Sequence, residues 1–98
     1  MGEAATHVGI LYVELFIGEA QSLKEKRKVL KSLKDRIRSQ FNVSVAELRG
    51  QEKWQVATLG FAMIGTDNRY MDRVLQNILS FIDRCHAVEI CGHDMEFC

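Results

Sequence analysis

The stretch Ser22–Gln40, SLKEKRKVLKSLKDRIRSQ, decides the fold, because it marks the start of a helix and shows which side of that helix packs against the core. Ser22 and Glu25 match a capping box, in which the two side chains accept hydrogen bonds from free backbone N–H groups at the helix start. Apolar residues recur on one side at helical spacing, as in a helix that docks on a core. They are Leu23, Val29, Leu30, Leu33 and Ile37. We therefore expect a helix that begins at Ser22.

The same stretch concentrates positive charge. It holds eight basic residues against two acidic ones, a net charge of +6, although the formal net charge of the 98-residue chain is zero. The remaining residues therefore carry a net −6. Because segregated charge creates a local field that the net charge conceals, possible partners have to be sought at the helix. The bases are Lys24, Lys26, Arg27, Lys28, Lys31, Lys34, Arg36 and Arg38.

Segments on either side of this helix are typical of strands. His7–Ile17 is rich in β-branched and aromatic residues, Asn42–Leu48 places Val43 and Val45 on one face, and Gln55–Ile64 is apolar on both faces. The polar stretch Arg49–Lys53 predicts a hairpin between the last two. After Thr66 or Asp67, apolar residues at helical spacing predict a second helix that ends near Arg84. His86–Phe97 is a last extended segment, and we expect its first half to be a strand.

The resulting βαββαβ order predicts the fold class α+β. It matches a ferredoxin-like sandwich, in which two helices cover one face of a four-stranded antiparallel sheet. At 98 residues the chain is long enough for one domain and too short for two, so we expect a single domain over residues 1–98. Gln55–Ile64 is apolar on both faces, which favours a central strand.

The face of the sheet without helices also carries apolar residues. Val8, Ile10, Tyr12 and Phe16 alternate with the core positions of the first strand, with Glu14 among them. Apolar residues along a whole second face are more than the single exposed hydrophobic residues of an ordinary protein surface, so we expect a partner to cover this face. The simplest partner is a second copy of the chain, in a homo-oligomer.

Several classes of protein are disfavoured by composition. The apolar runs are too short to cross a bilayer, and residues 1–7 do not have the pattern of a secretion signal, so we expect a cytoplasmic protein without a membrane partner. The three cysteines, Cys85, Cys91 and Cys98, are an odd number near the end of the chain, which favours reduced thiols.

The chain resembles the YlxP-like bacterial family of unknown function. The resemblance rests on Ser22–Arg27 (SLKEKR), Phe41–Glu47 (FNVSVAE), and Trp54-Gln55 together with Leu59-Gly60, in that order. It implies a ferredoxin-like domain whose gene often lies among those for translation and ribosome maturation. The resemblance implies this genomic setting but no activity. The cysteines and histidines at the C-terminal end lie outside the matching pattern.

The first helix is the candidate nucleic-acid site. Outward bases of this kind can contact phosphates, with a salt-dependent affinity, in a non-catalytic RNA- or ribosome-associated domain. The candidate residues are Lys24, Arg27, Lys28, Lys31 and Arg38. The alternative is a solvated helix face on a homodimeric protein-interaction or structural module that binds no nucleic acid.

An enzyme is not expected. The sequence has no Gly-rich phosphate loop, GxSxG or HExxH motif, and no small-molecule substrate or cofactor is indicated. Potential zinc ligands cluster near the end, but they lack CxxC or HxxxH spacing, so we expect no metal. They are Cys85, His86, Cys91, His93 and Cys98.

Three residues have a structural and a functional interpretation. Glu14 and Glu47 lie in apolar strands, where a carboxylate can be a base of raised pKa, but we favour pairing with a nearby Arg or Lys. Trp54 follows a polar loop, and we favour a core position over an interface position.

Overall fold

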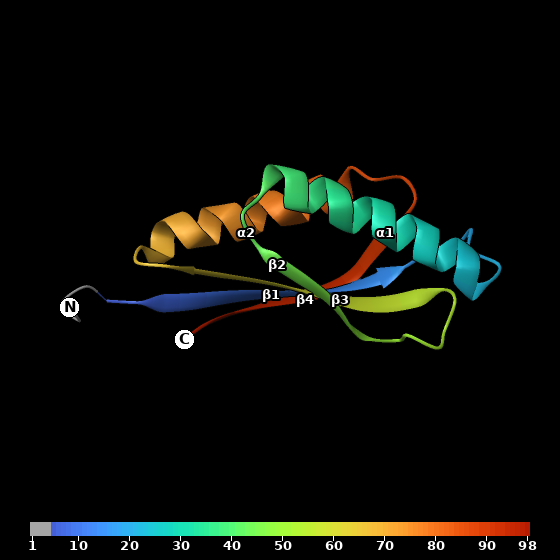
Figure 1. Ribbon diagram of the computed structural model, residues 1–98, viewed down its shortest axis with the longest axis horizontal. Helices are drawn as coiled ribbons and strands as arrows, with labels where there is room; N and C mark the ends of the chain where they lie inside the picture. The colour runs from blue at the N-terminus through green and yellow to red at the C-terminus, as the bar shows by residue number, and fades with distance from the viewer. Residues whose placement is uncertain (1–4) are drawn as a thin grey trace.

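The computed structural model describes residues 5–98. The elements follow the order βαββαβ, as expected for a ferredoxin-like α+β fold (Figure 1). They are β1 (His7–Phe16), α1 (Leu23–Gln40), β2 (Ser44–Arg49), β3 (Val56–Gly65), α2 (Asn68–Asp83) and β4 (Glu89–Phe97).

The four strands form one antiparallel sheet in the order β2-β3-β1-β4, and both helices lie on the same side of it (Figure 1). β3 and β1 are therefore the central strands, which confirms the position predicted for Gln55–Ile64. β2 and β4 are the two edges. The core lies between the sheet and the helices, and its largest fully buried apolar side chains include Leu11, Leu59, Phe61, Leu75 and Ile78.

Both helices begin at the predicted caps. Ser22 Oγ accepts a hydrogen bond from the Glu25 N–H at 3.1 Å, and Glu25 Oε1 accepts one from the Gln21 N–H at 3.0 Å. The capping box is present, with the reciprocal bond one residue before the cap. Asp67 Oδ1 caps α2 by accepting hydrogen bonds from the N–H groups of Arg69 and Tyr70.

The last strand differs from the prediction. The chain turns after α2, where the Val88 N–H donates to the Cys85 carbonyl, and β4 begins only at Glu89 and continues to Phe97. A bulge then occurs at Cys91, because Ile90 pairs with Leu15 while Gly92 pairs with Glu14. The extra residue changes the alternation. His93 consequently pairs with Val13 and lies on the helix side with Ile90, whereas strict alternation would place them on opposite faces.

The other face of the sheet carries no helix (Figure 1). Strand pairing places alternate residues of each strand on it, and a second bulge at Leu48 brings Arg49 to this face opposite Thr58. We call it the open face. It comprises Val8, Ile10, Tyr12, Glu14 and Phe16 of β1, Val56, Thr58, Gly60, Ala62 and Ile64 of β3, Ser44, Ala46, Leu48 and Arg49 of β2, and Glu89, Gly92, Asp94 and Glu96 of β4.

Candidate nucleic-acid interface

Lys26 separates from the other bases of α1 because it is buried, with 1% of its surface exposed. Its ammonium group donates hydrogen bonds to the carbonyls of Gly50 and Lys53, the latter at 2.7 Å. It also pairs with Glu47 Oε2 at 2.9 Å, and within residues 5–98 that buried oxygen has no other partner. Lys26 therefore has a structural role. The pairing predicted for Glu47 is confirmed.

The contacts of Lys26 join α1 to the turn between β2 and β3. Gly50 in this turn has φ +85°, and a Cβ there would lie 2.8 Å from the Val56 carbonyl oxygen. Only glycine adopts this conformation without strain. Gln55 donates to the carbonyls of Gly18 and Ala20, which holds the β1–α1 loop at the same end of the molecule.

Five bases form a row along one side of α1. They are spaced by three, four, three and four residues, which brings them onto one side of a helix. Arg38 Nη2 donates to the Val45 carbonyl at 3.2 Å, so this side faces the edge strand β2. The row is about 21 Å long at 1.5 Å per residue. We call Lys24, Arg27, Lys31, Lys34 and Arg38 the basic row.

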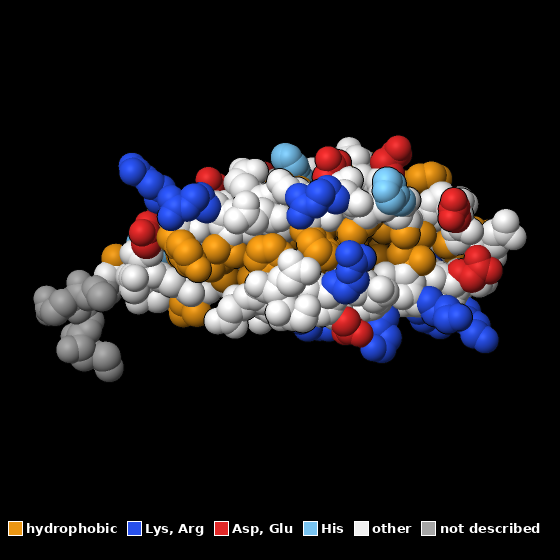
Figure 2. Space-filling model, turned by 90° about the horizontal axis from the view of Figure 1, so that it is seen from above, with side chains coloured by type: hydrophobic (Ala, Val, Ile, Leu, Met, Phe, Trp, Pro, Cys, Tyr) orange, Lys and Arg blue, Asp and Glu red, His pale blue; other side chains and the backbone are white. Residues whose placement is uncertain are grey.

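Seen from the helix side, lysine and arginine side chains gather along the lower right margin of the molecule, in the half where α1 begins (Figure 2). One acidic residue interrupts the basic row. Asp35 pairs with Lys31 at 2.6 Å and with Arg38 at 3.7 Å. The hydrogen bond from Lys31, followed by the charges of Lys31, Arg38 and Lys34, lowers the pKa of Asp35 below its ordinary value. Its carboxylate therefore offsets part of the positive charge at neutral pH.

Lys28 and Arg36 lie toward the loop after α2. The Arg36 guanidinium stacks over the Phe81 ring, 4.9 Å from its centroid, and lies 3.9 Å from Cys85 Sγ. Lys28 and Arg36 line a groove of about 290 Å³ between α1 and the loop after α2, together with Val88. Of the five predicted site residues, Lys24, Arg27, Lys31 and Arg38 belong to the basic row. Lys28 lies one turn from both Lys24 and Lys31, at the border between the row and this groove.

Lys34 is the member of the basic row that the predicted set omits. The regular spacing of three and four residues in the sequence is the signal that could have identified Lys34. Lys24, Arg27 and Lys34 make no ion pair within residues 5–98, so their charges are not neutralised by this part of the chain.

Trp54 and Glu14 differ from expectation. Trp54 is 51% exposed, so the core position favoured for it is wrong. It follows the turn at Gly50–Lys53, and β3 begins only at Val56. Glu14 lies exposed on the open face and, in the part of the chain that the structure describes, makes no ion pair.

The cysteines are free thiols: Cys85 is half-buried, and Cys91 and Cys98 are exposed. Among the described residues, no three His, Cys, Asp or Glu side chains gather as a metal site would require. None of the helices in residues 5–98 is long and apolar enough to cross a membrane.

Comparisons with known proteins support the resemblance seen in the sequence. A solved structure, the de novo designed protein Foldit4, matches 96% of this chain and 97% of its own with a TM-score of 0.52; at 14% identity it supports the fold alone. The uncharacterized protein YlxP of Bacillus subtilis (strain 168) is 38% identical over 82 residues, 84% of this chain and 89% of that protein. A family model described as "Protein of unknown function (DUF503)" matches residues 8–95. The chain therefore belongs to the DUF503 family of proteins of unknown function.

Proposed function

We propose that this protein is a non-catalytic RNA- or ribosome-associated domain that binds phosphate groups through the basic row. The observation that carries the proposal is the alignment of Lys24, Arg27, Lys31, Lys34 and Arg38 on one side of α1. The translation setting that the family resemblance implies supports the same choice of partner.

The physical basis is charge neutralisation. Each base that contacts a phosphate releases a condensed counterion, so such binding is favourable at low salt and weakens as salt rises. A row about 21 Å long can follow a nucleic-acid backbone past several phosphates. Asp35 lies within the row and repels phosphates, which keeps the affinity moderate.

The protein offers little for reading bases. The aromatic residues Tyr12 and Phe16 lie on the open face, across the sheet from α1. The exposed ring of Trp54 follows Lys53, whose carbonyl is bonded to Lys26 of α1. It offers a stacking surface to an unpaired base near the start of the basic row, and stacking of this kind tolerates any base. We therefore expect weak sequence preference.

The test is a triple charge reversal. The variant Lys24→Glu, Arg27→Glu, Lys31→Glu is titrated into fluorescein-labelled single-stranded ribosomal RNA fragments, and binding is followed by fluorescence anisotropy at low salt. We expect a loss of at least about 100-fold in affinity, because several phosphate contacts become repulsive. The matched control reverses three exposed bases at α2 and its end, Arg69, Arg73 and Arg84, and retains binding.

Circular dichroism establishes that both triple variants are folded. Equal binding by the two variants would contradict the proposal, because the effect would then depend on net charge and not on the basic row. Absence of binding by the wild-type protein at low salt would contradict it as well. The second interpretation, a homodimeric module that binds no nucleic acid, would then be favoured. A dimer by itself is compatible with RNA binding, because the open face lies across the sheet from α1.

A further inference from the structure

The open face combines exposed apolar residues with an uneven distribution of charge. Ile64 is 71% exposed, and Leu48, Val56 and Phe16 are each exposed by between 37% and 43%. These side chains extend from one end of the central strands to the other, since Ile64 pairs with Val8 and Val56 pairs with Phe16. An apolar surface of this extent is typical of a surface that another protein covers.

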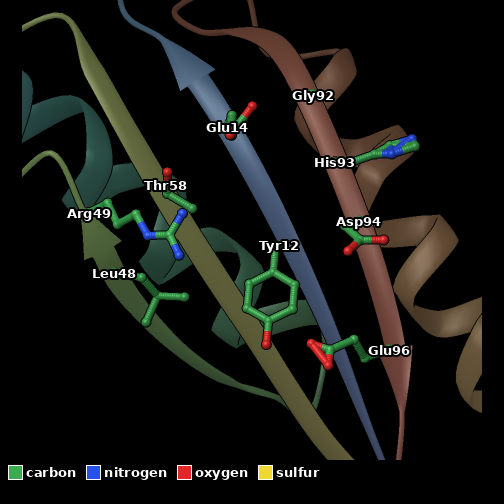
Figure 3. Close-up of a pocket in the computed structure, with 9 residues that line it drawn as sticks. All are labelled: Tyr12, Glu14, Leu48, Arg49, Thr58, Gly92, His93, Asp94 and Glu96. Carbon is green, nitrogen blue, oxygen red and sulfur yellow. The ribbon is translucent and has the colours of Figure 1, made fainter.

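The charges of the open face divide between its two halves. Arg49 lies on the edge strand β2, whereas Glu14, Asp94 and Glu96 lie on β1 and β4. Within residues 5–98 none of these four side chains forms an ion pair. They surround a cavity of about 520 Å³, with Arg49 on one side and the carboxylates on the other (Figure 3).

Tyr12 stands between the two halves of this cavity, and its hydroxyl points toward Glu96 (Figure 3). The hydrogen bond to Glu96 raises the pKa of Tyr12, and the nearby charges of Glu96 and Asp94 raise it further. The β4 half of the open face is therefore a region of negative potential. A guanidinium group is its natural counterpart.

We propose that a second copy of this chain covers the open face, with the two sheets face to face and the two-fold axis parallel to the strands. Rotation about such an axis places β2 of each copy over β4 of the other. Arg49 of one copy then meets the acidic half of its partner, and the same contact occurs twice. The surface is thus complementary to itself in charge.

The strand register supports this orientation. Arg49, Thr58, Glu14 and Gly92 lie side by side in one row across the sheet. The rotation places Arg49 over Gly92, which has no side chain, and between the carboxylates of Glu14 and Asp94. In the same way it places Thr58 over Glu14.

The apolar positions also match under this rotation. Ala62 pairs with Ile10 within the chain, and the rotation lays Ala62 of one copy over Ile10 of the other. Ile64 lies over Val8, and Val56 lies over Phe16, by the same rule. Apolar side chains therefore meet apolar side chains along both central strands.

The other aligned orientation is unfavourable. A two-fold axis perpendicular to the strands would place β4 over β4, so that Asp94 and Glu96 of both copies would face one another. Like charges buried in an interface cost several kcal/mol. A face about 30 Å long and roughly 19 Å wide has a flat area of about 570 Å², which is somewhat less than the area of about 800 Å² that each partner contributes to a standard interface.

The test is molecular mass as a function of protein concentration, measured by sedimentation equilibrium. We expect the wild-type protein to have twice the monomer mass at micromolar concentration. Arg49→Glu should dissociate the dimer at least tenfold more readily, because it places a carboxylate among three others. The double variant Arg49→Glu, Asp94→Arg reverses the pair in both copies and should restore the dimer.

Two further variants make the result decisive. Ile64→Glu changes a side chain that is already 71% exposed, so it should leave the fold intact and yield a monomer. Lys24→Glu is a matched charge change on the helix side and should leave the mass unchanged. A monomeric wild-type protein, or a double variant that dissociates as readily as Arg49→Glu, would overturn the proposal. Neither outcome bears on RNA binding by the basic row.

Discussion

At the scale of single residues, Lys26 shows how a charge that looks functional can belong to the fold. Its buried ammonium group satisfies Glu47 and the carbonyls of Gly50 and Lys53. Removal of one partner of a buried ion pair leaves an uncompensated charge. We predict that Lys26→Met lowers the free energy of unfolding by about 3 to 5 kcal/mol, measured by urea denaturation.

The control for this prediction is Lys24→Met, two residues away and exposed. A surface substitution of this kind changes stability by no more than about 0.5 kcal/mol. If Lys26→Met proves as stable as Lys24→Met, the structural role assigned to Lys26 is wrong.

From the sequence, Lys26 was counted among the eight bases of the helix and left out of the candidate site, but its burial was not predicted, because helical periodicity does not show which loop packs against the helix. Its burial depends on the turn at Gly50–Lys53, more than twenty residues further along the chain. The pairing of Glu47 was predicted correctly, because a buried carboxylate requires a cationic partner. The identity of that partner was not predicted, because it depends on the packing of α1 over β2. The same reasoning failed for Glu14, whose side chain is exposed on the open face.

Asp35 provides a second prediction at this scale. Its pKa is lowered in the folded protein, so its contribution to stability is present above the pKa of the unfolded chain and is lost as pH falls through the folded pKa. Lys31→Met removes the main cause and should return the pKa of Asp35 toward its ordinary value. Carbon-detected NMR titration of the carboxyl group measures the shift. Lys24→Met is the control, and an equal titration of Asp35 in both variants would argue against the ion pair.

At the scale of elements, α1 depends on its first turn. Ser22 Oγ satisfies the Glu25 N–H, and loss of such a cap costs about 0.5 to 2 kcal/mol. We predict that Ser22→Ala lowers the midpoint of urea unfolding accordingly. Ser32→Ala, at an exposed position within the same helix, serves as the control and should change stability by no more than about 0.5 kcal/mol. Equal midpoints would show that the capping box contributes nothing.

The elements other than β4 were predictable from local signals, such as the apolar runs of β1 and β3, the helical spacing in α1 and α2, and the cap before each helix. The two bulges were not. Leu48 and Cys91 carry no mark in the sequence, and each bulge exists only relative to the strand beside it. Because of these bulges, Arg49 lies on the open face and His93 lies on the helix side of the sheet.

At the scale of the whole molecule, the sheet separates two surfaces. α1, which carries the basic row, lies on one side of the sheet (Figure 1), and the open face presents apolar and acidic groups on the other (Figure 3). In the proposed dimer both open faces are covered and both basic rows remain exposed. The net charge of zero is therefore the sum of two surfaces of different charge, for which we propose different partners.

The central claim is that the basic row, and not the positive charge of α1 as a whole, contacts phosphates. The most direct measurement is the dependence of RNA affinity on salt concentration for Lys34→Gln and Lys28→Gln. Each phosphate contact on a single strand contributes about 0.7 to the slope of log affinity against log salt. We predict that Lys34→Gln makes the slope less steep by about 0.7 while Lys28→Gln leaves it unchanged. Equal slopes for the two variants would contradict the account.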